Sequence, residues 1–233
     1  MKKFLISLVL ILVVLISLMS TPLFNIQGIN VYGNTSVSDN QVRGYIPFGN
    51  IFTFSARSAR EQLLQNPYVY RMTSSRNFLT REININIIER EKIGYVHFSE
   101  NHYLAIDREG RVLEVLEQRS STLPEITGLN FPPFRLGELL EVEAPHIFNT
   151  ISYLTSLFIT YQTPSDIAID ISAGQQIMLN YGLISINLGT NDELDEKIRT
   201  MLSILPSIEN FKNIGGTLDI SNLEGQWFFS LPL

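Results

Sequence analysis

Few side chains in this sequence could support catalysis or metal binding. It has three histidines, His97, His102 and His146, and no cysteine. A helical zinc site needs a spacing such as His-Glu-x-x-His, and a thiolate site needs cysteine. Neither pattern occurs, so we expect the histidines at surface or strand positions and predict no metal and no cofactor.

The densest group of carboxylates lies between Asp192 and Glu196. Catalytic carboxyl groups must face each other across a cleft, whereas neighbours on one helix share a solvated face. Gly215-Gly216 is not followed by Lys-Ser or Lys-Thr, so it is no phosphate loop, and no Gly-x-Ser-x-Gly motif occurs. We therefore predict that the protein is not an enzyme and has no small-molecule substrate.

Aromatic residues near the C-terminus are the remaining candidates for binding. Trp227-Phe228-Phe229 is expected in a final hairpin, where an exposed sheet edge presents unpaired N–H and C=O groups to a partner strand. In the alternative interpretation, Trp227 and Phe229 face the core and Phe228 faces water or a helix. The sequence leaves both interpretations open.

The N-terminus is long and apolar enough to hold the chain in a membrane. Phe4 to Met19 carries no charge, and with the next five residues the segment reaches the roughly 20 residues that span a bilayer. Lys2-Lys3 precedes it and no basic residue follows before Arg43, which places the N-terminus in the cytoplasm. A cleavable signal peptide shares these features, but Leu18 stands where cleavage requires a small residue. We expect a stub at 1–3 and a retained transmembrane anchor at 4–23.

The charge of the exported part limits its partners. It keeps 15 of the 17 basic residues against 23 acidic ones, a net charge of about −8. Nucleic acid is therefore not expected as a partner. Because no polybasic stretch is present either, we expect contact with the lipid bilayer through the N-terminal helix alone.

The first 65 exported residues predict the order strand, helix, helix, strand, strand. A strand at 26–32 precedes a helix that Ser38 caps, with Gln41 as its capping-box partner. A second helix starts at Ser55 or Ser58, and Glu61 is in capping-box position from Ser58. Strands at 69–76 and 81–90 follow, the latter with isoleucines alternating with polar residues.

The rest of the chain predicts a mixed β-sheet with flanking helices, so the fold class is α+β. Strands are expected at 95–98, 102–106, 111–115, 166–171, 176–179 and 183–189, with further strands at the C-terminus. Helices are expected at 146–161 and after Asn191, which we predict as a cap, with Glu193 four residues before Lys197.

Several short sequence motifs, taken in their order along the chain, resemble the POTRA domain of the FtsQ/DivIB family of bacterial cell-division proteins. They are Ile29-x-Val31-x-Gly33-Asn34, Gly49-Asn50-Ile51-Phe52, Asn66-Pro67-Tyr68-Val69 and Ile88-Glu89-Arg90. Asp107 to Gly110, Leu123 to Gly128 and the segments from Ile186 to Ile220 resemble the family's β domain. The resemblance implies a POTRA domain (βααββ) at 24–91 and an FtsQ-type β domain at 92–233.

The resemblance also implies a function. It is that of a single-pass scaffold of the divisome, located at the septum, that binds FtsB/DivIC-like and FtsL-like proteins outside the cytoplasm and helps couple assembly to septal peptidoglycan synthesis. The partner-binding residues carried over by position are Asp219, Ile220, Ser221, Asn222 and Trp227. Ile220→Pro is then predicted to abolish partner binding.

Two departures from the family pattern are visible. The cytoplasmic tail is almost absent, and the family's Asp-Leu-Arg-Tyr phrase appears as Asp219-Ile220-Ser221-Asn222. The alternative function is that of a POTRA-bearing envelope protein of secretion or outer-membrane assembly.

Overall fold

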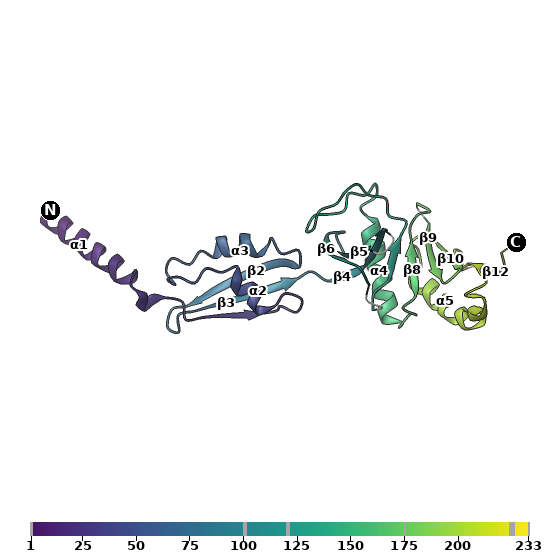
Figure 1. Ribbon diagram of the computed structural model, residues 1–233, viewed down its shortest axis with the longest axis horizontal. Coiled ribbons are helices and arrows are strands. Elements are labelled where there is room, and N and C mark those ends of the chain that lie inside the picture. The colour runs from purple at the N-terminus through teal and green to yellow at the C-terminus, as the bar shows by residue number, and fades with distance from the viewer. Residues whose placement is uncertain (1, 100–101, 120–121, 175, 224–226, 233) are drawn as a thin grey trace. The chain divides into compact units, whose positions relative to one another are not determined.

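The computed structural model describes residues 2–99, 102–119, 122–174, 176–223 and 227–232. The chain divides into two compact units, Met1–Arg90 and Glu91–Leu233. Each unit has its own hydrophobic core and its own sheet (Figure 1).

The first unit begins with the apolar helix that the sequence predicts. Helix α1 (Lys2–Met19) has no buried residue, and within the described part of the chain it is the one helix long and apolar enough to cross a membrane. Its 18 residues rise about 27 Å at 1.5 Å per residue, close to the thickness of a hydrocarbon core. The short helix η1 (Pro22–Phe24) follows it.

A three-stranded sheet under two helices completes this unit. Its elements are β1 (Gly28–Tyr32), α2 (Asp39–Gly44), α3 (Ala56–Leu63), β2 (Val69–Asn77) and β3 (Glu82–Glu89). Strand β3 lies in the middle, parallel to β1 and antiparallel to β2. The alternating Ile83, Ile85 and Ile87 are buried together with Val42 of α2 and Leu63 of α3. The predicted order of elements is confirmed.

The helix starts in this unit confirm one sequence prediction and correct another. Ser38 caps α2, and Ser38 and Gln41 form both hydrogen bonds of a capping box. Helix α3 is capped by Ser55 instead of Ser58. Glu61 therefore has no capping role, and its carboxylate pairs with Arg57 on the helix surface at 2.8 Å.

A half-buried carboxylate connects the loop after β1 to the end of β3. The Glu89 carboxylate accepts hydrogen bonds from the backbone N–H groups of Thr35, Ser36 and Val37 at 3.0, 2.7 and 2.9 Å. Gly33 starts this loop with a positive φ of 78°, and a β-carbon there would overlap the carbonyl oxygen of Ile87. Burial alone would raise the pKa of Glu89, but the three backbone hydrogen bonds lower it below its usual value.

The second unit is built on a nine-stranded mixed sheet in the order β12-β11-β10-β9-β8-β7-β4-β5-β6. Its strands are β4 (Lys92–Ser99), β5 (His102–Asp107), β6 (Val112–Leu116), β7 (Glu125–Thr127), β8 (Ile167–Asp170), β9 (Ile177–Tyr181), β10 (Ile184–Gly189), β11 (Gly216–Asp219) and β12 (Phe228–Ser230). The pairs β4–β7, β7–β8 and β10–β11 are parallel, and the others are antiparallel.

Two helices supply the crossovers between parallel strands and cover one face of this sheet. Helix α4 (Ile147–Thr160) joins β7 to β8, and α5 (Leu194–Ile208), followed by η2 (Glu209–Phe211), joins β10 to β11. The Thr155 hydroxyl of α4 donates to the Ile93 carbonyl of β4 at 2.7 Å, and the Tyr161 hydroxyl donates to Asp195 of α5. Along β8, β9 and most of β10 buried residues alternate with half-buried ones, the pattern of a sheet covered on one face.

The start of α5 differs from the prediction. Asn191 does not cap this helix, which begins at Leu194 after Glu193 in a left-handed conformation with a φ of 55°. Lys197 does not reach Glu193 with its ammonium group. Its side chain is buried and donates to the Thr190 carbonyl at 3.2 Å, because the turn before the helix folds back over it.

The Asp107 to Gly110 turn forms as predicted, and its glycine is required by packing. Asp107 accepts hydrogen bonds from the Glu109 and Arg111 backbone N–H groups, both at 2.9 Å. Gly110 has a φ of 80°, and a β-carbon there would overlap the ring of Phe148 in α4. The turn thus anchors α4 against the β5–β6 hairpin.

Candidate functional site

The predicted partner-binding residues gather at the end of the sheet that β11 and β12 form. Asp219 is the last residue of β11, Ile220 to Asn222 follow it directly, and Trp227 immediately precedes β12. Strand β12 pairs antiparallel with β11, with Leu218 opposite Phe229 and Asp219 opposite Phe228. The structure therefore brings these residues into one hairpin, part of which lies outside the described residues.

Asp219 holds the end of β11 in place. Its carboxylate accepts the Ser221 backbone N–H at 2.9 Å and the Asn187 side-chain amide of β10 at 3.2 Å. Burial would raise the pKa of Asp219, but the bonds from Ser221 and Asn187 lower it below its usual value. The sequence analysis did not single out Asn187, although it stands opposite Asp219 in the parallel ladder.

Ile220 is a core residue. Its side chain is 1% exposed, and its backbone N–H donates to the Asn187 carbonyl at 3.0 Å. A proline at this position would therefore lose a sheet hydrogen bond and disturb the core together. Any loss of binding in Ile220→Pro would not distinguish a lost partner contact from a damaged fold.

The three terminal aromatic residues face different surroundings. Phe229 packs on the core, with its ring centroid 5.3 Å from that of Phe211, while Phe228 is 68% exposed. Trp227 is 50% exposed, so the alternative interpretation, in which it faces the core, does not hold for this residue. The β11–β12 ladder ends at the pair Asp219 and Phe228, and Trp227 therefore lies beyond the paired part of the hairpin.

Strand β12 is an edge strand, so one of its two hydrogen-bonding sides is directed away from the sheet. The Ile220 N–H points to β10, and backbone groups of successive strand residues point to opposite sides. Asp219 and Thr217 therefore point to β12, where they are paired with Phe228 and Ser230. It follows that the N–H and C=O of Phe229 point outward from the sheet.

The opposite edge of the sheet is partly covered. The Val112 N–H at the start of β6 donates to the Glu138 carbonyl at 3.0 Å, and the Gly137 N–H donates to the Val112 carbonyl at 2.9 Å. A loop thus occupies the beginning of that edge. The outer side of β12 has no such pairing among the described residues.

The three histidines considered for metal binding or catalysis lie at separate positions in the second unit. His97 stacks on Tyr103 with ring centroids 5.2 Å apart, and His102 contacts the Ser99 hydroxyl at 3.1 Å. His146 immediately precedes α4, away from the other two in the fold. Within the described ranges no group of three or more histidine, aspartate or glutamate side chains could hold a metal ion.

Comparison with known proteins shows which proteins this chain resembles. The FtsQ-type POTRA domain matches residues 24–90, which is the region of the three-stranded sheet. The cell division protein DivIB of Clostridium botulinum strain Hall is 26% identical over 231 residues, covering 94% of this chain and 88% of that protein. DivIB of Clostridium acetobutylicum is 26% identical, covering 90% and 84%, and DivIB of Clostridium tetani is 27% identical, covering 86% and 78%.

The chain is thus similar to DivIB proteins along most of its length, and its residues 24–90 match the FtsQ-type POTRA domain. The family resemblance drawn from the sequence phrases is confirmed, and so is the α+β fold with an apolar N-terminal helix, a POTRA domain and a large mixed sheet. Similarity to DivIB cell division proteins supports a role in the divisome. The apolar helix α1 fits a single-pass membrane protein.

Proposed function

We propose that this protein is a non-enzymatic scaffold of the divisome that binds other single-pass division proteins by adding one of their strands to β12. The partners are proteins of the FtsB/DivIC and FtsL types, and their binding helps couple assembly to septal peptidoglycan synthesis. In this proposal Lys2-Lys3 keeps the N-terminus in the cytoplasm, while the POTRA domain at 24–91 and the β domain at 92–233 lie outside it.

The observation that carries this proposal is the outward backbone of Phe229 on the terminal strand. Main-chain N–H and C=O groups at a sheet edge give affinity to an added strand, and nearby side chains set its register. Trp227 and Phe228 immediately precede this position, with 50% and 68% of their surface exposed. They offer a partner strand apolar area next to the hydrogen-bonding residue.

The proposed residues divide into two roles. Trp227 contacts the partner, and Asp219, Ile220 and Ser221 hold β11 in the position that supports β12. Asn222 is exposed next to this support. Truncation of Trp227 should therefore weaken partner binding without changing the stability of the β domain, whereas changes at Ile220 should reduce both.

The decisive experiment compares two substitutions at one position. Phe229→Pro and Phe229→Ala both remove the ring that packs on Phe211, but only the proline removes the outward N–H. Full-length variants in detergent are tested for capture of the extracytoplasmic segments of the host's FtsB/DivIC-like and FtsL-like proteins. Far-UV circular dichroism and chemical denaturation establish that both variants are folded.

Strand addition predicts at least a tenfold weaker capture by Phe229→Pro than by Phe229→Ala, since one interstrand hydrogen bond and the strand register are lost. Equal capture by the two variants would refute binding through the β12 backbone. Failure of the wild-type chain to capture either segment would refute these partners.

A further inference from the structure

We propose that the POTRA domain has a second contact with the membrane, through an apolar rim that inserts into the outer interfacial layer of the bilayer. The apolar rim consists of Leu23, Phe48, Phe52, Phe78 and Leu79. These side chains are 68%, 68%, 37%, 52% and 96% exposed. The proposal rests on α1 spanning the bilayer and does not depend on the partner binding at β12.

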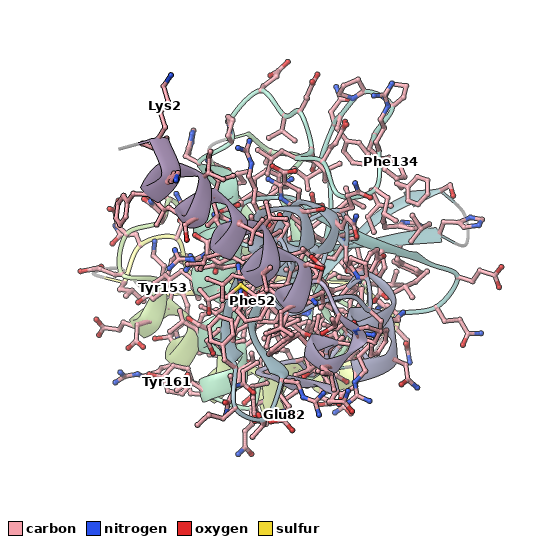
Figure 2. All side chains as sticks on the ribbon, turned by 90° about the vertical axis from the view of Figure 1, so that its left-hand side faces the viewer. Lys2, Phe52, Glu82, Phe134, Tyr153 and Tyr161 are labelled. Carbon is pink, nitrogen blue, oxygen red and sulfur yellow. The ribbon has the colours of Figure 1, made fainter. Side chains whose placement is uncertain are left out.

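The apolar rim is assembled from three separate segments of the first unit. Phe52 packs edge-on against Phe24 of η1 at 5.1 Å between ring centroids and stacks on Phe78 of the β2–β3 turn at 5.4 Å. The Gly49 carbonyl, next to Phe48, accepts the Ile26 N–H at 2.9 Å. Figure 2 looks from the α1 side and labels Phe52. Exposed apolar side chains that gather in this way mark an interaction surface.

Hydrogen bonds fix this surface to the end of the membrane helix. The Asn50 side-chain amide donates to the Met19 carbonyl, the last residue of α1, at 2.7 Å. The Arg81 guanidinium donates to the Leu23 carbonyl at 2.5 Å. Chain length alone keeps the apolar rim close to the end of α1, since five residue steps from Met19 to Phe24 extend at most about 18 Å.

The position of the apolar rim relative to the bilayer indicates that it contacts lipid. With about 27 Å of helix inside a hydrocarbon layer of about 30 Å, the end of α1 lies at the outer boundary of that layer. Aromatic side chains favour this interfacial depth, and arginine reaches from it to phosphate headgroups. Arg76 and Arg81 lie beside the apolar rim, with Arg76 stacked over Phe54 at 5.6 Å and Arg81 bonded to the Leu23 carbonyl.

This inference revises one expectation from the sequence. Absence of a polybasic stretch pointed to membrane contact through the N-terminal helix alone. The apolar rim escaped sequence analysis because its members are spread over nearly 60 residues and become neighbours only when the sheet forms.

The absence of cysteine makes this proposal directly testable. Single cysteines at Leu79, at Ile88 and at Leu10 of α1 are labelled with the environment-sensitive fluorophore NBD. The full chain is placed in nanodiscs that hold one copy and contain an anionic phospholipid. Quenching by a lipid-bound nitroxide is then compared with quenching by aqueous iodide.

Ile88 is the matched control. It is 46% exposed and lies six residues beyond Glu82 on β3, about 20 Å along the strand from the apolar rim. We expect Leu79→Cys to be quenched several-fold more by the lipid nitroxide than Ile88→Cys, and less by iodide. Adding Phe78→Asp to Leu79→Cys should reduce the lipid quenching towards the Ile88 value while circular dichroism stays unchanged.

Equal quenching of the labels at positions 79 and 88 would overturn the proposal. Shielding of position 79 that appears only in discs with two copies would overturn it in favour of self-association. Lipid quenching at position 10 without lipid quenching at position 79 would leave α1 as an anchor and refute only the apolar rim. Absence of lipid quenching at position 10 would refute both.

Discussion

Glu89→Gln should release the loop after β1 from the end of β3. In the folded protein the Glu89 carboxylate accepts three backbone N–H groups at 2.7 to 3.0 Å. Glutamine keeps the shape but replaces one acceptor oxygen with an NH₂ donor, which then faces another donor. At least one of the three N–H groups therefore loses its partner.

The size of this effect follows from the number and exposure of these bonds. A hydrogen bond to a charged group contributes about 1.5–3 kcal/mol. Water can replace part of the lost bonding because the carboxylate is only partly buried, so we expect about 2 kcal/mol in total. A free energy of about 2 kcal/mol corresponds to about a 30-fold increase in local opening.

Amide hydrogen exchange measures this opening at the three donors. In the full chain, Thr35, Ser36 and Val37 should exchange about 30-fold faster in Glu89→Gln than in wild type. Glu91→Gln makes the same charge change at an exposed position two residues on and should leave the exchange unchanged. Unaltered exchange in Glu89→Gln would refute the assignment of Glu89 as the anchor of this loop.

The pH dependence gives a second readout with a defined sign. Because the folded-state pKa of Glu89 is lowered, its stabilisation is fully present above the unfolded pKa of about 4.3 and is lost as pH falls through the folded pKa. The exchange difference between wild type and Glu89→Gln should therefore shrink as the pH falls below about 4.

Three further predictions concern packing and caps. Gly110→Ala should destabilise the second unit by about 2–4 kcal/mol in urea unfolding, because the added β-carbon overlaps its neighbours and the backbone is in a left-handed conformation. Gly174 has a similar φ but no atoms near its β-carbon position, so Gly174→Ala should cost only about 1–2 kcal/mol. Thr155→Val should lower the free energy of unfolding by about 1–3 kcal/mol in the same assay, because it removes a buried hydrogen bond. Its control is the exposed Thr160→Val, whose free energy of unfolding should lie within about 0.5 kcal/mol of wild type. Ser38→Ala should cost α2 about 1 kcal/mol, visible as faster amide exchange in its first turn.

Local patterns predicted most elements of this fold because each depends on residues close in sequence. The alternation of Ile83, Ile85 and Ile87 with polar residues predicts β3, and Ser38 with Gln41 predicts the start of α2. The start of α5 was predicted wrongly because Glu193 adopts a left-handed turn and Lys197 folds beneath it, which depends on contacts with the rest of the unit. A favourable cap residue is only a weak local preference against such contacts.

In the candidate site, too, the sequence predicted some features, whereas others depended on contacts between distant segments. Phe229 was predicted inward as one of two open interpretations, and the structure confirms that orientation, while Trp227 lies outside the ladder that would have turned it inward. The sequence could not indicate how far the β11–β12 pairing extends. That extent is set by where β11 ends at Asp219, held by Asn187 from another strand.

The sequence by itself determined the apolar N-terminal helix, the order of strands and helices in the POTRA domain and the resemblance to the FtsQ/DivIB family. Hydrophobic periodicity, turn residues and caps act within a few residues, and they can therefore be recognised in the amino-acid sequence. The tertiary structure decided which strand lies at the sheet edge, which loop Glu89 holds and which aromatic residues form the apolar rim. Each of these depends on pairing between segments tens of residues apart, where many partners compete and only the assembled core selects among them.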